Sequence, residues 1–341
     1  MIGLQLSSYT LSSSLPASFT VYGAGRESAL VSILLQGECI YSSRLYGNAA
    51  GNCTFYEFRQ IVEQYMAARS LALAELEIMV DDGERQEQIN GVFVIFCRYR
   101  NTGSDDEEFL QQRFLTNRSY ATLPRGQMMM LSFFATQEES NMAYFDCVFQ
   151  SDKGVTELTV RQAVYKFDRP AVYSLLVSAA YLKELADEEA GDDCGRLLSF
   201  TARMGQRSLP VFIHDGEPCA HLSFRNSFNV WEELFVFGTV TRKTDISRKE
   251  AIIMGVSSFY DKSVSRKCEV ATAPLSLEEA RWMNEFLESD EVVMEVSSNC
   301  PAEPVLISDI TSEISDSAKE QVIIKFSYRF ADNARFIVFN S

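Results

Sequence analysis

Short apolar runs with strand-like spacing recur along the whole chain of 341 residues and are separated by polar turns. Side chains on one face of a β-strand recur at every second position, so a half-buried strand shows apolar and polar residues in alternation. The segment Gln321–Phe330 follows this pattern most clearly, with apolar residues at Val322, Ile324, Phe326, Tyr328 and Phe330. We predict an antiparallel strand there. The 24 Phe and 14 Tyr, against only 8 Pro, favour packed sheets elsewhere too.

The length of the chain exceeds what one ordinary hydrophobic core supports, so we expect several domains. Acidic residues from Asn101 to Glu108 and a turn-rich stretch over 195–208 mark two candidate boundaries. The prediction is therefore a mainly β protein of tandem antiparallel β-sandwich-like domains, each sheet accompanied by few short helices. Its domains would be a β-sandwich-like domain over 1–112, a middle β domain over 113–207, and a C-terminal β domain over 208–341.

Two segments show the pattern of a capped amphipathic helix. A Ser or Thr followed three residues later by Glu is the capping-box spacing, and it occurs at Thr54 with Glu57 and at Ser276 with Glu279. Apolar residues follow each pair at helical spacing. We predict one helix over 54–68 in the first domain and one over 276–288 in the last.

The middle of the chain offers several strands and one ambiguous segment. Residues 113–117, 127–134 and 142–149 have strand-like character, and the acidic residues from Asp187 to Gly195 are expected to form a loop. Val172–Leu185 fits both a strand and a helix, because short apolar runs cannot be assigned by periodicity alone.

A hairpin is expected near the start of the last third. Leu209–Ile213 and Ala220–Phe224 are apolar runs that flank the turn pair Asp215-Gly216. Asp-Gly between two such runs is a recognised hairpin signal. The sequence therefore predicts that these two strands pair with each other.

The charge balance excludes some classes of partner. The chain has 31 Lys and Arg against 47 Asp and Glu, a formal charge of -16. Non-specific binding to nucleic acid and to anionic membranes both depend on an excess of basic residues. We therefore expect a soluble protein that binds neither nucleic acid nor membrane.

Neither a leader nor a membrane span is visible in the sequence. Residues Met1–Leu6 show no signal-peptide pattern, which predicts synthesis in a cytoplasm. The longest apolar stretch, Ala171–Leu182, is too short to span a bilayer. Eight Cys are scattered without a Cys-x-x-Cys pair, several of them inside apolar runs, so we expect reduced thiols.

Candidate metal and nucleophile residues are few. The only two His, His214 and His221, flank the expected hairpin turn, with Cys219 between them. Their spacing matches no standard zinc pattern, and no fourth ligand is evident. Any Ser-His-Asp triad would need one of these two His. We predict no metal site and no catalytic residue.

Candidate phosphate and nucleophile loops are incomplete. Gly23-Ala24-Gly25 lacks the third Gly of a dinucleotide fingerprint, and Gly255-Val256-Ser257-Ser258-Phe259 lacks the second Gly of a nucleophile elbow. The acidic runs lack the alternating spacing of a calcium loop. We predict no cofactor. A pair of facing carboxylates for glycan cleavage stays open, because spatial distance defines it.

Several short motifs together resemble a known group of proteins. They include Arg225-Asn226-Ser227-Phe228, Phe237-Gly238-Thr239, Ala273-Pro274-Leu275-Ser276 and Phe326–Asn333, with a less sharp match at Phe114–Arg118. Together they resemble virion and prophage structural proteins of Bacteroides-type hosts. The resemblance covers most of the chain and is strongest from about residue 208 onward.

That resemblance implies a tail, baseplate or other particle role without enzymatic activity. It implies tandem β-sandwich domains and protein partners, namely further copies of the chain or other particle proteins. The expected location is the virion, assembled in the host cytoplasm and released by lysis. Two alternatives stay open. One is a carbohydrate- or receptor-binding β-sandwich with Trp231 and Trp282 as candidate aromatics, and the other is a glycan-cleaving enzyme.

Overall fold

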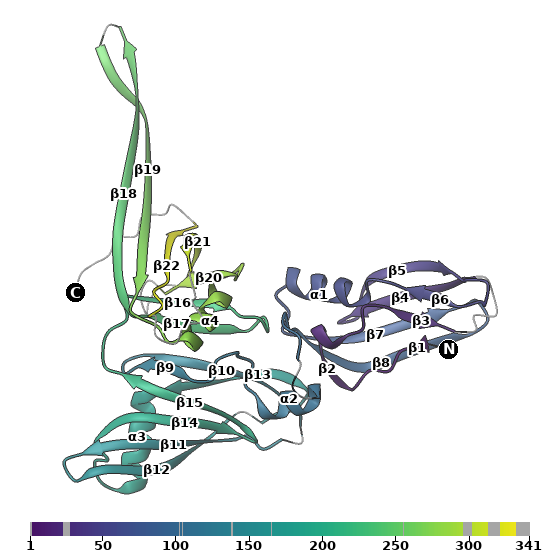
Figure 1. The fold of residues 1–341 in the computed structure, drawn as a ribbon, viewed down its shortest axis with the longest axis horizontal. Coiled ribbons are helices and arrows are strands. Elements are labelled where there is room, and N and C mark those ends of the chain that lie inside the picture. The colour runs from purple at the N-terminus through teal and green to yellow at the C-terminus, as the bar shows by residue number, and fades with distance from the viewer. Residues whose placement is uncertain are drawn as a thin grey trace. The chain divides into compact units, whose positions relative to one another are not determined.

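The computed structural model describes residues 2–22, 28–101, 103, 105–137, 139–164, 166–254, 256–295, 302–312 and 321–331. The described chain forms two compact units, of which the first contains Met1–Thr116, Met129–Val211 and Asn226–Trp231. The second contains Asn117–Met128, Phe212–Arg225 and Glu232–Ser341. Most of the described elements are strands, as expected for a mainly β protein (Figure 1). The three-domain division stays a prediction.

The N-terminal part of the first unit is built from two sheets with a shared core. One sheet has the order β1 (Ile2–Gly3), β3 (Phe19–Val21), β6 (Cys53–Phe55). The other has the order β2 (Tyr9–Leu11), β8 (Gln86–Ile95), β7 (Leu73–Asp81), β4 (Ser28–Leu35), β5 (Glu38–Tyr46). Strand β4 alternates buried and half-buried residues along its length, the pattern of a strand with one face on the core. Only β2 pairs with its neighbour in parallel among the registers of this second sheet.

The helix predicted over 54–68 is shorter than expected. Helix α1 spans Phe58–Ala68 and buries Phe58, Val62 and Met66 against the core of both sheets. The capping box at Thr54 and Glu57 is wrong, because Thr54 belongs to strand β6 and pairs with Thr20 of β3. Glu57 has a left-handed φ of 62° and makes no side-chain cap.

The middle part of the first unit packs helices against further sheets. A ladder of β12 (Gly154–Ala163), β11 (Met142–Ser151), β14 (Arg196–Met204) and β15 (Arg207–His214) lies beside helix α3 (Ala179–Ala190). Strand β10 (Met128–Ala135) pairs with β13 (Ala171–Ser178), and the short helix α2 (Asp106–Gln112) packs beside β2. Aromatic rings fill the interior, as in the edge-to-face contact of Phe145 and Phe200 at 5.9 Å between ring centroids.

Several predictions for this part need correction. The stretch Asn101–Glu108, expected to mark a domain boundary, contains the start of a helix, because α2 begins at Asp106. Residues 113–117 form no strand. The ambiguous segment contains both expected structures, since β13 runs directly into α3. Helix α3 also includes residues 187–190 of the expected acidic loop, and it ends where Gly191 adopts the left-handed conformation with a φ of 68°.

The second unit contains a large sheet covered by one helix. Its strand order is β17 (Trp231–Val236), β16 (Ala220–Arg225), β20 (Val292–Met294), β21 (Glu303–Thr311), β22 (Lys325–Phe330), β19 (Val256–Thr272), β18 (Gly238–Ile253). Helix α4 (Leu277–Leu287) buries Ala280, Met283 and Phe286 in the core. The predicted capping box of Ser276 and Glu279 is confirmed, with both reciprocal hydrogen bonds present.

The predicted hairpin at Asp215-Gly216 is wrong. Strand β15 belongs to the ladder with β14, whereas β16 lies between β17 and β20 in the large sheet. The short strand β9 (Ala121–Pro124) instead lies near the end of β15, where Arg125 donates its backbone N–H to the His214 carbonyl at 3.0 Å. The expected strand near the C-terminus is present as β22, and the alternate residues Val322, Ile324, Phe326 and Tyr328 are buried.

Candidate interaction site on the long hairpin

The longest strands of the described chain form a hairpin that extends beyond its sheet. Strands β18 and β19 pair from Gly238 with Thr272 to Ile253 with Val256. The adjacent strand β22 pairs with β19 only over Cys268–Ala271, and β18 is the last strand of its sheet. Figure 1 shows the remaining hairpin standing clear of the other strands of the second unit. We call residues 241–267 the arm.

The arm exposes several large apolar side chains. At its tip, Met254 is 99% exposed and Ile252 is 75% exposed. The other large apolar side chains exposed on the arm are Ile246, Val256, Phe259 and Tyr260. A two-stranded hairpin is at best marginally stable alone in water. Contiguous exposed apolar surface is characteristic of interaction sites.

The two faces of the arm differ in charge. Residues that are paired across the hairpin point to the same face, and the face alternates along each strand. By the register, one face carries Ile246 opposite Val264 at its centre. It also carries four cations, Arg242, Arg248, Lys262 and Arg266, and one carboxylate, Glu250, which lies nearer the tip. We call this surface the basic face.

The opposite face carries three Lys, and each forms a salt bridge with a carboxylate. Lys243 pairs with Glu269 at 2.7 Å, and Lys249 pairs with Asp261 at 3.0 Å. Lys267 pairs with Asp309 of β21. This hydrogen-bonded pair raises the pKa of Lys267 and lowers that of Asp309. The three lysines of this face are therefore each paired with a carboxylate within the unit.

The basic face lacks such compensation in the described residues. Arg248 and Lys262 stand directly opposite each other in the register, and neither has a salt bridge within the described chain. Arg248 instead lies over the ring of Phe259, 5.3 Å from its centroid. Like charges directly opposite across a hairpin destabilise it. This arrangement suits a surface that meets an anionic partner.

The residues singled out for metal binding do not come together. His214 accepts the backbone N–H of Gly216 at 2.9 Å and lies on the Phe237 ring, with 3.9 Å between centroids. His221 lies on the Phe235 ring at 4.6 Å. Cys219 is half-buried on the second unit's core. Across the described residues, no group of three His, Cys, Asp or Glu is arranged to hold a metal ion.

The two tryptophans do not form an exposed aromatic platform. Trp282 packs on the core of the second unit and lies 3.9 Å beneath the Arg118 guanidinium. Arg118 also pairs with the buried carboxylate of Glu232 and donates to the carbonyl of Glu233 at 2.6 Å. Trp231 is half-buried. Sheet-face carbohydrate binding therefore gains no support from these two residues.

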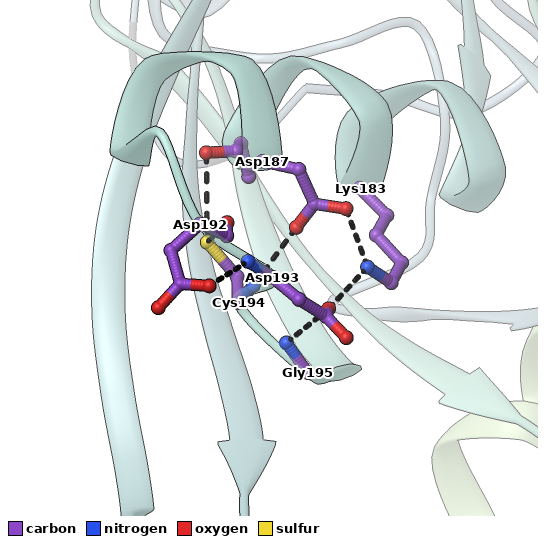
Figure 2. Close-up of polar contacts among 7 residues, drawn as sticks. Lys183, Asp187, Asp192, Asp193, Cys194 and Gly195 are labelled. Carbon is purple, nitrogen blue, oxygen red and sulfur yellow. Dashed lines mark hydrogen bonds and ion pairs between the residues drawn. The ribbon is translucent and has the colours of Figure 1, made fainter.

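The acidic residues at the end of α3 are held by a lysine (Figure 2). The Lys183 ammonium donates to Asp187 at 2.5 Å and to Asp193 at 2.8 Å. These hydrogen bonds lower the pKa of both carboxyls. The two carboxylates also accept the backbone N–H groups of Cys194 and Gly195. We interpret the cluster as a structural contact that fixes the loop after α3, in which the Lys183 ammonium binds both carboxylates.

A cavity of about 530 Å³ in the first unit lies beside Arg207. The side chain of Arg207 is only 1% exposed. Its guanidinium donates to the carbonyl oxygens of Leu110 and Phe134 and to the carboxylate of Glu139, each at 2.6 Å. These acceptors engage the cation within the protein. We therefore interpret Arg207 as a structural residue that joins the loops around the cavity.

The motif Arg225-Asn226-Ser227-Phe228 has a structural role. Asn226 donates to the Leu115 carbonyl at 2.8 Å and accepts the N–H of Phe228 at 2.9 Å. Asn229 has a left-handed φ of 55° and donates to the Leu71 carbonyl at 3.1 Å. The side chains of Asn226 and Asn229 are buried. The motif places the segment Asn226–Trp231 within the first unit.

The arm itself was not identified from the sequence. The arm lacks the apolar alternation that a buried face produces, so its spacing does not predict a long strand. The available signal was a run of β-branched residues and Ser alternating with charges over 239–249 and 262–268. Gly23–Gly25 and Gly255, from the two incomplete loop motifs, lie outside the described residues.

Comparisons with known proteins do not assign the chain to a family. Neither the protein-family models nor the curated proteins include a match to it. Within the described chain, every helix is too short or too polar to cross a bilayer.

Proposed function

We propose that this protein is a non-enzymatic structural component of a phage or prophage particle and acts through protein–protein interfaces. The observation that carries the proposal is the arm, a two-stranded ribbon exposed on both faces with an apolar tip. A two-stranded hairpin is marginally stable by itself, and exposed apolar surface of this kind is typical of a protein–protein interface. The resemblance of several short motifs to those of virion proteins favours the same role.

The rest of the described chain suits a scaffold for this arm. Sheets with continuous cores and a capped helix fix the base of β18 and β19. The candidate metal ligands are separated, and the buried cations Arg118 and Arg207 are bound to protein acceptors. Assembly in a host cytoplasm and a final location in the virion follow from the proposed role.

The test measures whether the chain is present in purified particles. A lysogenic bacterium that carries the gene is induced to lyse, particles are purified on a density gradient, and the chain is quantified by mass spectrometry. The proposal expects the chain to copurify with particles in a fixed ratio to their other proteins. Its absence from intact particles would sink the proposal.

A shortened variant tests the role of the arm. Residues 246–264 are removed, and Asn-Gly joins Asp245 to Ser265, which face each other in the register. Asn-Gly favours the two-residue turn of a tight hairpin, so the base of the arm is kept. We expect a folded body, checked by its thermal unfolding, and at least about tenfold less chain in particles. Incorporation equal to that of wild type would show that the arm is not needed for assembly and would contradict the proposal.

A further inference from the structure

The arm and the remainder of the chain carry opposite net charges. Residues 241–267 contain seven Lys and Arg against three Asp and Glu, a formal charge of +4. The remaining 314 residues therefore carry -20 of the total -16. Complementary surfaces of this kind steer association and fix its register. The body of a second copy of the chain carries the opposite net charge and is therefore a complementary partner for the arm.

We infer that the basic face of the arm docks on the acidic surface of a second copy of this chain. This inference rests on the proposed function and names its partner. Four cations that form no salt bridge with another described residue surround the apolar pair Ile246 and Val264, which gives the centre of an interface with a charged rim. Ile252 and Phe259 extend the same face toward the tip, where Glu250, which stands opposite Phe259, adds the face's one carboxylate.

Pairing between two arms is disfavoured by the same charges. Each arm carries +4, so two basic faces repel each other. Lysines and other charges along an edge strand are a common device against edge-to-edge pairing. Docking of an arm on the body of a neighbour avoids this repulsion. Such a contact joins different surfaces of two copies, and it builds a ring or an open chain when repeated.

The first measurement is the solution mass of the full chain by light scattering, over a concentration series at 50 mM and 500 mM NaCl. We expect association that strengthens with concentration and weakens at least about tenfold in Kd at the higher salt, because salt screens exposed charges. A monomer at every concentration in low salt would overturn the inference. Presence of that monomeric chain in particles would leave the proposed function standing.

The second measurement reverses the charge of the basic face. In the double variant R248E/K262E the arm charge falls from +4 to 0. We expect at least about tenfold weaker association. The matched control is R161E/K166E, which makes the same charge change at two exposed residues of the body. The control should associate as wild type does. Equal behaviour of the two variants would contradict the inference.

The third measurement looks for the receiving surface. Six of the ten residues from Glu184 to Asp193 are acidic, and Glu188 and Glu189 are exposed. We combine E188K/E189K with R248E/K262E in one chain. Restored association would identify the end of α3 as the receiving surface. If R248E/K262E loses association and the combined variant does not regain it, the arm docks on another acidic surface of the second copy.

Nucleic acid is the competing partner for a basic ribbon. Gel shift with duplex DNA at 50 mM NaCl tests it on the wild-type chain and on R248E/K262E. The inference expects no shift at concentrations where the chain associates with itself. A DNA shift that R248E/K262E abolishes, together with a monomeric free protein, would replace the second copy by nucleic acid.

Discussion

Arg248 and Lys262 face each other directly across the β18–β19 hairpin, two cations with no carboxylate bonded to them in the described chain. Each could be replaced by a residue that stabilises the hairpin better. Opposite charges at facing positions contribute roughly 0.2–1 kcal/mol, and like charges cost a similar amount. We therefore interpret this pair as retained for binding, at the expense of the arm's own stability.

The first prediction concerns the single substitution Lys262→Glu. It creates a cross-strand ion pair with Arg248, so the arm should open less often, and its backbone amides should exchange more slowly with deuterium. Lys262→Gln removes only the repulsion and should give an intermediate rate. The same Lys262→Glu variant should self-associate less. Faster exchange in Lys262→Glu than in wild type would show that the pair does not strain the hairpin.

The second prediction concerns the buried pair of Arg118 and Glu232, whose side chains are 7% and 6% exposed. Arg118→Ala leaves the Glu232 carboxylate buried without this partner and exposes the Trp282 ring. We expect the free energy of unfolding to fall by about 3–5 kcal/mol. Urea unfolding followed by tryptophan fluorescence measures it.

The control for that prediction is Arg125→Ala. Arg125 pairs with Asp215 at 2.8 Å, but both side chains are more than a third exposed. Exposed pairs contribute less than about 1 kcal/mol. A loss as large for Arg125→Ala as for Arg118→Ala would show that burial does not determine the cost.

Local signals in the sequence were reliable where local contacts determine the structure. The box of Ser276 and Glu279 is such a case, because both partners lie within one helical turn. The same spacing failed at Thr54, because pairing of Thr54 with Thr20 across the sheet takes that residue into a strand. The turn at Asp215-Gly216 failed for a related reason. Asp-Gly indicates a change of direction but does not select the strand partner, which is determined by distant residues.

The candidate site is not predictable from the sequence, because only a strand with a buried face shows regular apolar alternation. The core strand β4 has one buried face and alternates visibly. The arm has no buried face, so its apolar residues, such as Ile246 and Val264, stand singly among charged residues in the sequence. The basic face becomes visible only when the register between 242–248 and 262–268 is known. The predicted fold class is confirmed, whereas the site depended on pairing that spacing alone does not fix.

The third prediction is a pH dependence due to His221. Burial lowers the pKa of His221, and the carboxylate of Glu295 opposes this only in part. The folded chain thus favours neutral imidazole, while the unfolded chain binds a proton below about pH 6.5. The stability of the second unit should therefore fall as pH decreases from about 7 to 5, by at most about 1.4 kcal/mol per pH unit for this group.

His221→Gln isolates that contribution. Wild type and variant are unfolded in urea at pH 7.5, 6.5 and 5.5, and their free energies are subtracted. Carboxyl groups that do not interact with His221 contribute equally to both chains, so they cancel in the difference. The stability of wild type relative to the variant should decrease toward pH 5.5. A difference that is constant or rises toward low pH would contradict the assignment.

The fourth prediction concerns thiol reactivity. Burial raises the pKa of Cys147 to about 12, and its side chain is fully buried between strands, whereas Cys39 is exposed. The thiolate is the reactive form, so Cys147 should resist alkylation at pH 8 while Cys39 is modified within minutes. Iodoacetamide labelling followed by peptide mass spectrometry measures both sites. Cys39→Ser should remove the fast phase, and denaturation in urea should expose Cys147. Fast labelling of Cys147 in the folded chain would show that β11 separates from its neighbours more often than a packed core strand does.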